Sequence, residues 1–185
     1  MTFPFEPAPW FVLMSPFERY MANTEDRLRL KKQTVKHVLF LCIGNSCRSQ
    51  MAEGFAKQYG SDVMEAKSAG LSPAAIVQPL TFQTMEEKNV KLDGQCPKDL
   101  SSITISDFDL LVNMSGVKLP SRIPLTVREW KIEDPIGRSE EVYREVRDQI
   151  EDLVMRLILE FRRDLRPKVK DGRTTGFAGL GRRPR

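Results

Sequence analysis

A cysteine and an arginine stand six residues apart in a short, mostly polar stretch of the chain. Cys42 and Arg48 enclose Ile-Gly-Asn-Ser-Cys, which makes the stretch a Cys-x5-Arg sequence. A cysteine thiolate is a nucleophile, and a guanidinium group matches two oxygens of a tetrahedral oxyanion. This pair of residue types therefore indicates covalent chemistry on phosphate or a similar anion. The spacing alone is a weak signal, so its structural context decides its meaning.

The residues on either side of this stretch supply that context. Val38 to Cys42 is a continuous apolar run, typical of a strand that is covered on both faces of a parallel sheet. Apolar residues then recur at helical spacing before Gly60: Met51, Ala52, Phe55, Ala56 and Tyr59. The stretch thus joins a strand to the start of a helix, where free backbone N–H groups and the helix dipole favour an anion.

The turn itself has the composition of an oxyanion cradle. Gly44 and Asn45 tolerate backbone angles that let successive N–H groups curl around one anion. Its candidate phosphate-binding residues are Ile43, Gly44, Asn45, Ser46, Cys47, Arg48 and Ser49. The positive field of such a cradle should keep Cys42 a thiolate at neutral pH, with a hydrogen bond from Ser49.

Further segments alternate between strand and helix patterns. Strands are expected at 63–68, 108–113 and 125–132, and helices at 77–88 and from about 139 to 161. We therefore predict an α/β fold with a four-stranded parallel sheet flanked by helices and wound on both sides. Its phosphate-binding loop lies between the first strand and the first helix, at the carboxyl end of the sheet where such folds bind ligands.

The chain of 185 residues fits one domain with two appendages. We assign residues 35–165 to the domain, 1–34 to a flexible arm and 166–185 to a disordered basic tail. The formal charge is +4, but residues 172–185 alone hold four arginines and no acid. The domain is thus nearly neutral, which argues against nucleic acid as its partner.

The sequence also limits location and cofactors. The longest apolar run of the arm, residues 10–14, is too short and lacks the basic flank of a signal peptide, and no segment reads as a membrane span. Met21 is a candidate translation start. Three cysteines, an odd number, favour a reducing cytoplasm. Cys42, Cys47 and His37 lack the paired spacing of zinc ligands, so we expect no metal and no organic cofactor.

The stretch from Cys42 to Glu53 closely resembles the phosphate loop of the low-molecular-weight protein tyrosine phosphatase family, which includes the thioredoxin-linked arsenate reductases. The resemblance covers about residues 36–162, and Gly-Asn-Ser-Cys-Arg-Ser-Gln-Met-Ala-Glu-Gly looks more like the reductase branch. It implies that Cys42 forms a phosphocysteine. The leaving group needs an acid, and Asp134, rather than Glu133, matches the Asp-Pro acid of the family.

The chain departs from the family pattern at several positions. Met114 stands where the reductases have their first relay cysteine, so the three-cysteine relay is absent. Cys96 is expected to be an ordinary semi-buried thiol, whereas Cys47 either pairs with Cys42 on oxidation or only packs behind the loop. Ile136 replaces the aromatic residue that stacks on phosphotyrosine. Lys91 aligns with an acidic potassium ligand of the reductases, which places an ammonium group beside Glu53.

These observations lead to three functional hypotheses. The first is a cysteine-dependent phosphomonoester hydrolase that acts on a phosphorylated protein or a small phosphate ester, with Cys42, Arg48 and Asp134 as catalytic residues. The second is an arsenate reductase that uses an external thiol or glutaredoxin, since arsenate mimics phosphate. The third is an oxyanion-sensing module without catalysis. None of them involves nucleic acid or a membrane.

Overall fold

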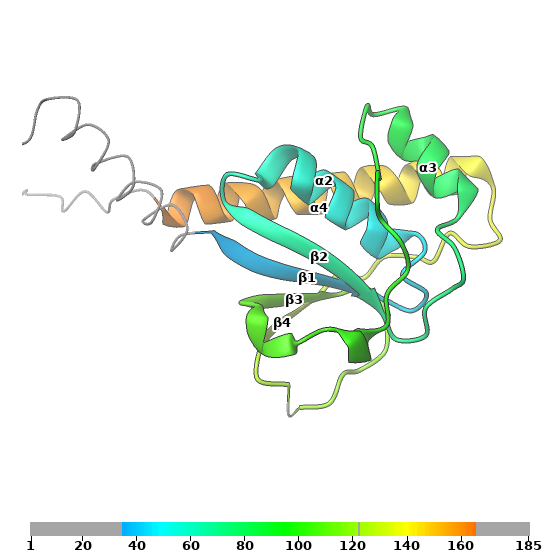
Figure 1. The fold of residues 1–185 in the computed structure, drawn as a ribbon. Helices are drawn as coiled ribbons and strands as arrows, with labels where there is room; N and C mark the ends of the chain where they lie inside the picture. Colours follow the sequence, from blue (N-terminus) through cyan, green and yellow to red (C-terminus); the bar gives the residue numbers. More distant parts are fainter. Residues whose placement is uncertain (1–34, 122, 166–185) are drawn as a thin grey trace, which may run out of the picture.

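The computed structural model describes residues 35–121 and 123–165, so the predicted arm and tail lie outside the described residues. Its strands are β1 (Lys36–Cys42), β2 (Met64–Gly70), β3 (Leu110–Asn113) and β4 (Thr126–Glu129). Its helices are α2 (Arg48–Gly60), α3 (Pro79–Glu86) and α4 (Glu140–Asp164), with short 3-10 helices η2 (Leu100–Ser102) and η3 (Ile105–Asp107) (Figure 1). The predicted α/β fold with a four-stranded sheet is confirmed.

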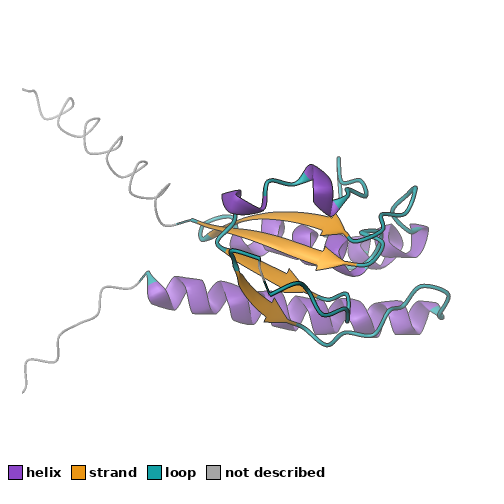
Figure 2. Cartoon of the chain, turned by 90° about the horizontal axis from the view of Figure 1, so that it is seen from below, coloured by secondary structure: helices purple, strands orange, loops and turns teal. Residues whose placement is uncertain are grey.

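All four strands are parallel, and their order in the sheet is β2-β1-β3-β4. The chain moves outward in one direction from β1 to β2 and then returns to the other side of β1 to form β3. β1 therefore ends at the point where the winding direction reverses, which is where open α/β sheets bind their ligands. The arrowheads of the strands point to the same end of the sheet in Figure 2. Cys42 is the last residue of β1 at this end.

The two faces of the sheet are covered in different ways. Val38 and Phe40 face a core formed with α2, α3 and α4, whereas Leu39 and Leu41 face Phe108 and its neighbours on the other side. The second face is covered by the segment that carries η2 and η3 and by loop residues such as Leu119, rather than by an α-helix. Burial on both faces explains why β1 reads as a continuous apolar run.

Helix α4 begins where the sequence predicts, with Ser139 as its N-cap residue, but the Ser139 hydroxyl makes no capping hydrogen bond. The Glu141 carboxylate accepts a hydrogen bond from a main-chain N–H of the helix instead. A backbone hydrogen bond, followed by one from Ser139, lowers the pKa of Glu141. An acid in the first turn thus performs the stabilising role expected of the N-cap side chain. None of the helices in the described ranges is long and apolar enough to cross a membrane.

Candidate active site

The carbonyl groups of the loop after β1 all accept hydrogen bonds from outside the loop. Those of Cys42, Ile43 and Gly44 accept from the N–H groups of Leu71, Ser72 and Ala74, that of Asn45 from the Gln50 side chain, and that of Ser46 from the N–H of Gln78. The C=O and N–H of a trans peptide point in opposite directions, and no peptide bond among the described residues is cis. The N–H groups of residues 43–47 therefore lie on the opposite side of the loop, as an anion seat requires.

Cys42 lies within this loop with only 2% of its surface exposed. Its Sγ accepts a hydrogen bond from the Asn45 N–H at 3.2 Å and lies 3.0 Å from Ser49 Oγ. Asn45 adopts a left-handed backbone conformation with φ of 45°, as the sequence predicts. β2 approaches closely, since a Cβ atom at Gly70 would lie 2.7 Å from the Ile43 carbonyl oxygen. The tight turn thus depends on both Asn45 and a glycine at the end of β2.

The side chain of Asn45 anchors the loop to its surroundings. Its Nδ2 donates to Ser49 Oγ and to Ser68 Oγ, both at 2.8 Å, and its Oδ1 accepts from the Lys98 N–H at 2.7 Å. Gln50 is fully buried and bridges the carbonyls of Asn45 and Cys96. Gln50 and Ser68 lie in stretches that resemble the family, but the sequence assigned them no role at the site, and Lys98 lies outside any motif.

Arg48 and Asp134 meet at the rim of the loop, as the catalytic hypothesis requires. The Arg48 guanidinium is 5% exposed and donates to the carbonyls of Met114, at 2.8 Å, and Ile132, at 3.3 Å. It also forms an ion pair with the Asp134 carboxylate, which is 38% exposed and accepts from the Ile136 N–H. Carbonyls after β3 and β4 thus fix the guanidinium, while the acid keeps access to solvent.

Cys47 and Tyr143 lie behind the loop. Burial raises the pKa of the Cys47 thiol to about 12, and the neighbouring Cys42 and Asp134 act in the same direction, against a hydrogen bond from Thr81 and the charge of Arg48. Burial likewise raises the pKa of Tyr143 to about 12, with further contributions from Cys47 and Asp134. Both groups are therefore neutral at physiological pH. The redox role of Cys47 stays a prediction, and its high pKa makes it a slow attacking thiol.

We expect Cys47 to resist alkylation in the native protein. Its pKa rises from 9.0 to about 12, and three units reduce its thiolate fraction about a thousandfold. Iodoacetamide at pH 7.5 should label the exposed Cys96 but not Cys47, as measured by mass spectrometry of peptides. Labelling of both in urea is the control. Equal labelling rates for Cys47 and Cys96 without urea would contradict the burial argument.

The structure also shows the surroundings of the residues at which the chain departs from the family pattern. Ile43 and Ile136 are 41% and 46% exposed, so the rim is partly aliphatic. Met114 is buried at the end of β3, and the three cysteines of the chain are all free. Cys96 is exposed rather than semi-buried, because the 94–98 segment runs along the surface.

The expectation for Lys91 is wrong. The ammonium groups that pair with Glu53 belong to Lys57 and Lys98. Lys91 is exposed and lines a separate shallow hollow with Glu86 and Asp93. The alignment failed because the irregular segment after α3 gives no periodic pattern that fixes its register.

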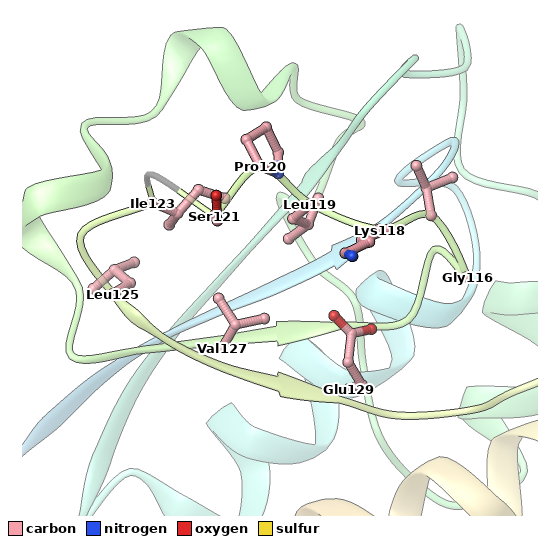
Figure 3. Close-up of a pocket in the computed structure, with 10 residues that line it drawn as sticks. Gly116, Lys118, Leu119, Pro120, Ser121, Ile123, Leu125, Val127 and Glu129 are labelled. Carbon is pink, nitrogen blue, oxygen red and sulfur yellow. The ribbon is translucent and has the colours of Figure 1, made fainter.

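A hollow of about 580 Å³ lies between β4 and the loop that precedes it (Figure 3). Its lining is mostly aliphatic and includes Leu119, Pro120, Leu125 and Val127, with Lys118 and Glu129 as charged members. It contains none of the predicted catalytic residues. The hollow is therefore separate from the predicted oxyanion site at the Cys42 loop.

Comparison with known proteins agrees with this geometry. A sequence model described as low molecular weight phosphotyrosine protein phosphatase matches residues 37–168. The chain belongs to this family. Family membership shows that the protein is an enzyme of the phosphatase and arsenate reductase type, whose substrates are phosphate esters or oxyanions. The resemblance seen in the phosphate loop is thereby confirmed.

The relatives within the low-molecular-weight phosphatase family include both reductases and phosphatases. A glutaredoxin arsenate reductase of Synechocystis is 38% identical over 128 residues, which cover 67% of this chain and 97% of the relative. A solved arsenate reductase in the phosphate-binding state is 37% identical with a TM-score of 0.65, over 69% of this chain and 99% of that one. The YwlE arginine phosphatase from Geobacillus stearothermophilus is 25% identical with a TM-score of 0.63, over 70% and 94% of the two chains.

Proposed function

We propose that the protein is a cysteine-dependent phosphomonoesterase that works through a phosphocysteine intermediate at Cys42. The observation that carries this proposal is the arrangement around one loop. Five N–H groups and the buried sulfur of Cys42 lie within it, and Arg48 and Asp134 meet at its rim. Hydrolysis of a phosphate ester needs these elements and no further thiol.

In the first step of this mechanism, the N–H groups of residues 43–47 and the Arg48 guanidinium hold the three non-bridging phosphate oxygens. The Cys42 thiolate attacks phosphorus and forms the S–P bond while the P–O bond to the leaving group breaks. Asp134 gives its proton to the departing oxygen. Ser49, at 3.0 Å from the sulfur, stabilises the thiolate before attack.

The second step regenerates the enzyme. The Asp134 carboxylate accepts a proton from a water molecule, which attacks phosphorus as the S–P bond breaks. Inorganic phosphate leaves, and Cys42 returns to the thiolate. Asp134 suits both roles because its carboxylate is partly exposed and is held by the Ile136 N–H.

The substrate proposed is a phosphorylated protein or a small phosphate ester. The exposed Ile43 and Ile136 give the rim aliphatic surface, and Ile136 directly follows the Asp134-Pro135 pair. An aliphatic side chain contributes no ring stacking, which favours esters other than phosphotyrosine.

Arsenate reduction with an external thiol is the second candidate, supported by 38% identity to a glutaredoxin arsenate reductase. Cys42 would displace water or hydroxide from arsenate and form an S–As(V) bond. An external thiol would then attack the Cys42 sulfur, giving a mixed disulfide while arsenic leaves as arsenite with two electrons. A second thiol would restore Cys42. Membership of an enzyme family favours either reaction over the third hypothesis, a sensing module.

Two parallel assays of reduced protein separate the candidates. One measures para-nitrophenyl phosphate hydrolysis at mildly acidic pH without added metal. The other measures arsenite formed from arsenate with glutathione and glutaredoxin. Turnover only in the first assay is the expected result. Arsenite release without phosphatase activity would replace the proposal with the second candidate, and inactivity of folded protein in both assays would favour sensing.

A further inference from the structure

We infer that Asn113, the last residue of β3, is a positioning residue for Arg48. Its side-chain oxygen Oδ1 accepts a hydrogen bond from the Ser115 main-chain N–H at 3.0 Å. That N–H belongs to the same peptide unit as the Met114 carbonyl, which accepts from Arg48 Nη1 at 2.8 Å. One peptide unit thus connects the two side chains. The inference rests on Arg48 as the phosphate clamp of the proposed function, but not on which of the two reactions follows.

The geometry of this peptide unit explains how Asn113 acts on Arg48. The C=O and N–H of a trans peptide point in opposite directions, and the described residues contain no cis peptide bond. Because the Ser115 N–H points toward Asn113, the Met114 carbonyl points the other way, toward the guanidinium. Rotation of the unit would withdraw this acceptor from Arg48. Asn113 therefore fixes the side from which the main chain holds the guanidinium.

The pairing of the sheet stops one peptide unit too early to hold the Met114 carbonyl. The Asn113 carbonyl accepts from the Trp130 N–H at 2.9 Å. The Met114 N–H donates to the Leu41 carbonyl at 2.7 Å. Both groups belong to the preceding peptide unit, and the register of β3 with both neighbouring strands ends at Asn113. Within the described part of the chain, the next unit is therefore held by Asn113 on one side and Arg48 on the other.

The side chain of Asn113 is itself firmly held. It is fully buried, and a buried amide is costly unless its hydrogen bonds are made. Nδ2 donates to the Val117 carbonyl at 2.9 Å and to the carboxylate of Glu129, its register partner on β4. Glu129 points toward the turn after β3 in Figure 3. Oδ1 also accepts from the Ser115 hydroxyl at 2.7 Å, so both donors and both acceptor sites of the amide are used.

The test is a double-mutant cycle between Asn113→Ala and Arg48→Met, with the affinity for inorganic phosphate as the readout. Isothermal titration measures this affinity, and phosphorus NMR extends the range to weak binding. We expect Asn113→Ala to weaken phosphate binding about tenfold, the scale of one lost hydrogen bond to a charged group. In the Arg48→Met background no guanidinium is left to position, so the same change should alter the affinity by less than about twofold.

Two further variants serve as rescue and as matched control. In Asn113→Ser, the hydroxyl can still accept from the Ser115 N–H, though more weakly than an asparagine does. It should therefore recover part of the phosphate affinity that Asn113→Ala loses. Glu129→Gln alters the neighbour of Asn113 but keeps an oxygen that accepts from Nδ2, so its affinity should stay within about twofold of wild type.

The outcomes separate this inference from the proposed function. No loss of affinity in Asn113→Ala, or an equal loss with and without Arg48, overturns the inference alone, because a merely structural role would act in both backgrounds. If Asn113→Ala does not fold, the cycle with Asn113→Ser decides, with a loss of about threefold expected only where Arg48 is present. An Arg48→Met variant that binds phosphate as tightly as wild type overturns the proposed clamp as well.

Discussion

Replacing the proposed nucleophile, Cys42→Ser, should lower turnover of para-nitrophenyl phosphate by about 10⁴-fold or more, because loss of a covalent nucleophile leaves only the contribution of binding. Phosphate binding should persist. The N–H groups of residues 43–47 and the Arg48 guanidinium are fixed by the Leu71–Gln78 segment, Gln50 and the carbonyls after β3 and β4, none of which involves the sulfur. Steady-state kinetics measures the first effect, and isothermal titration with inorganic phosphate the second.

Cys96→Ser is the control for this result, since Cys96 is exposed and a serine keeps the main-chain carbonyl that accepts from Gln50. It should retain wild-type activity. If Cys42→Ser keeps more than a tenth of the turnover, Cys42 is not the nucleophile. If it loses phosphate binding together with turnover, the loop depends on the sulfur for its shape, and the loss of activity would not establish covalent catalysis.

The loop after β1 could be predicted because the sequence signals that define it lie close together in the chain. A run of five apolar residues ends at Cys42, and the helical pattern begins a few residues later, so the turn between them is located by the sequence itself. Asn45, a residue type that tolerates the left-handed region, adopts it with φ of 45°, whereas Gly44 does not need a positive φ. Arg48 lies within the same short stretch, so its place in the loop does not depend on contacts between distant segments of the chain. Asp134 is distant in sequence, and only the family resemblance singled it out.

The support of the loop could not be predicted in the same way. Ser68 lies on β2 and Lys98 in an irregular segment that touches the end of β2, and parallel pairing with β1 brings both to Asn45. Such contacts depend on strand order and register, which a single sequence does not specify. Likewise, the alternation of strand and helix patterns predicts helices on both faces of the sheet. The stretch between α3 and β3 instead forms only 3-10 turns.

The second large effect concerns the acid. Asp134→Asn should reduce turnover of phenyl phosphate about 10²- to 10³-fold, but that of para-nitrophenyl phosphate by only about tenfold, because a good leaving group needs little proton help. Arg48 and the Ile136 N–H donate to different oxygens of Asp134, so asparagine keeps only one of these two hydrogen bonds and loses the ion pair together with the transferable proton. The ratio of kcat values for the two substrates, measured in each variant, isolates proton transfer from general damage to the site.

Glu133 offers a matched control for Asp134 one position earlier in the chain. Its carboxylate is 62% exposed and pairs with Arg138 at 3.2 Å, whereas Asp134 pairs with Arg48. Glu133→Gln should therefore change neither rate by more than about twofold, as expected for an exposed surface pair. Equal losses for the two substrates in Asp134→Asn would mean that Asp134 orients Arg48 rather than donates a proton. A larger loss with phenyl phosphate in Glu133→Gln would instead identify Glu133 as the general acid. The loop before α4 would then have to rearrange when substrate binds.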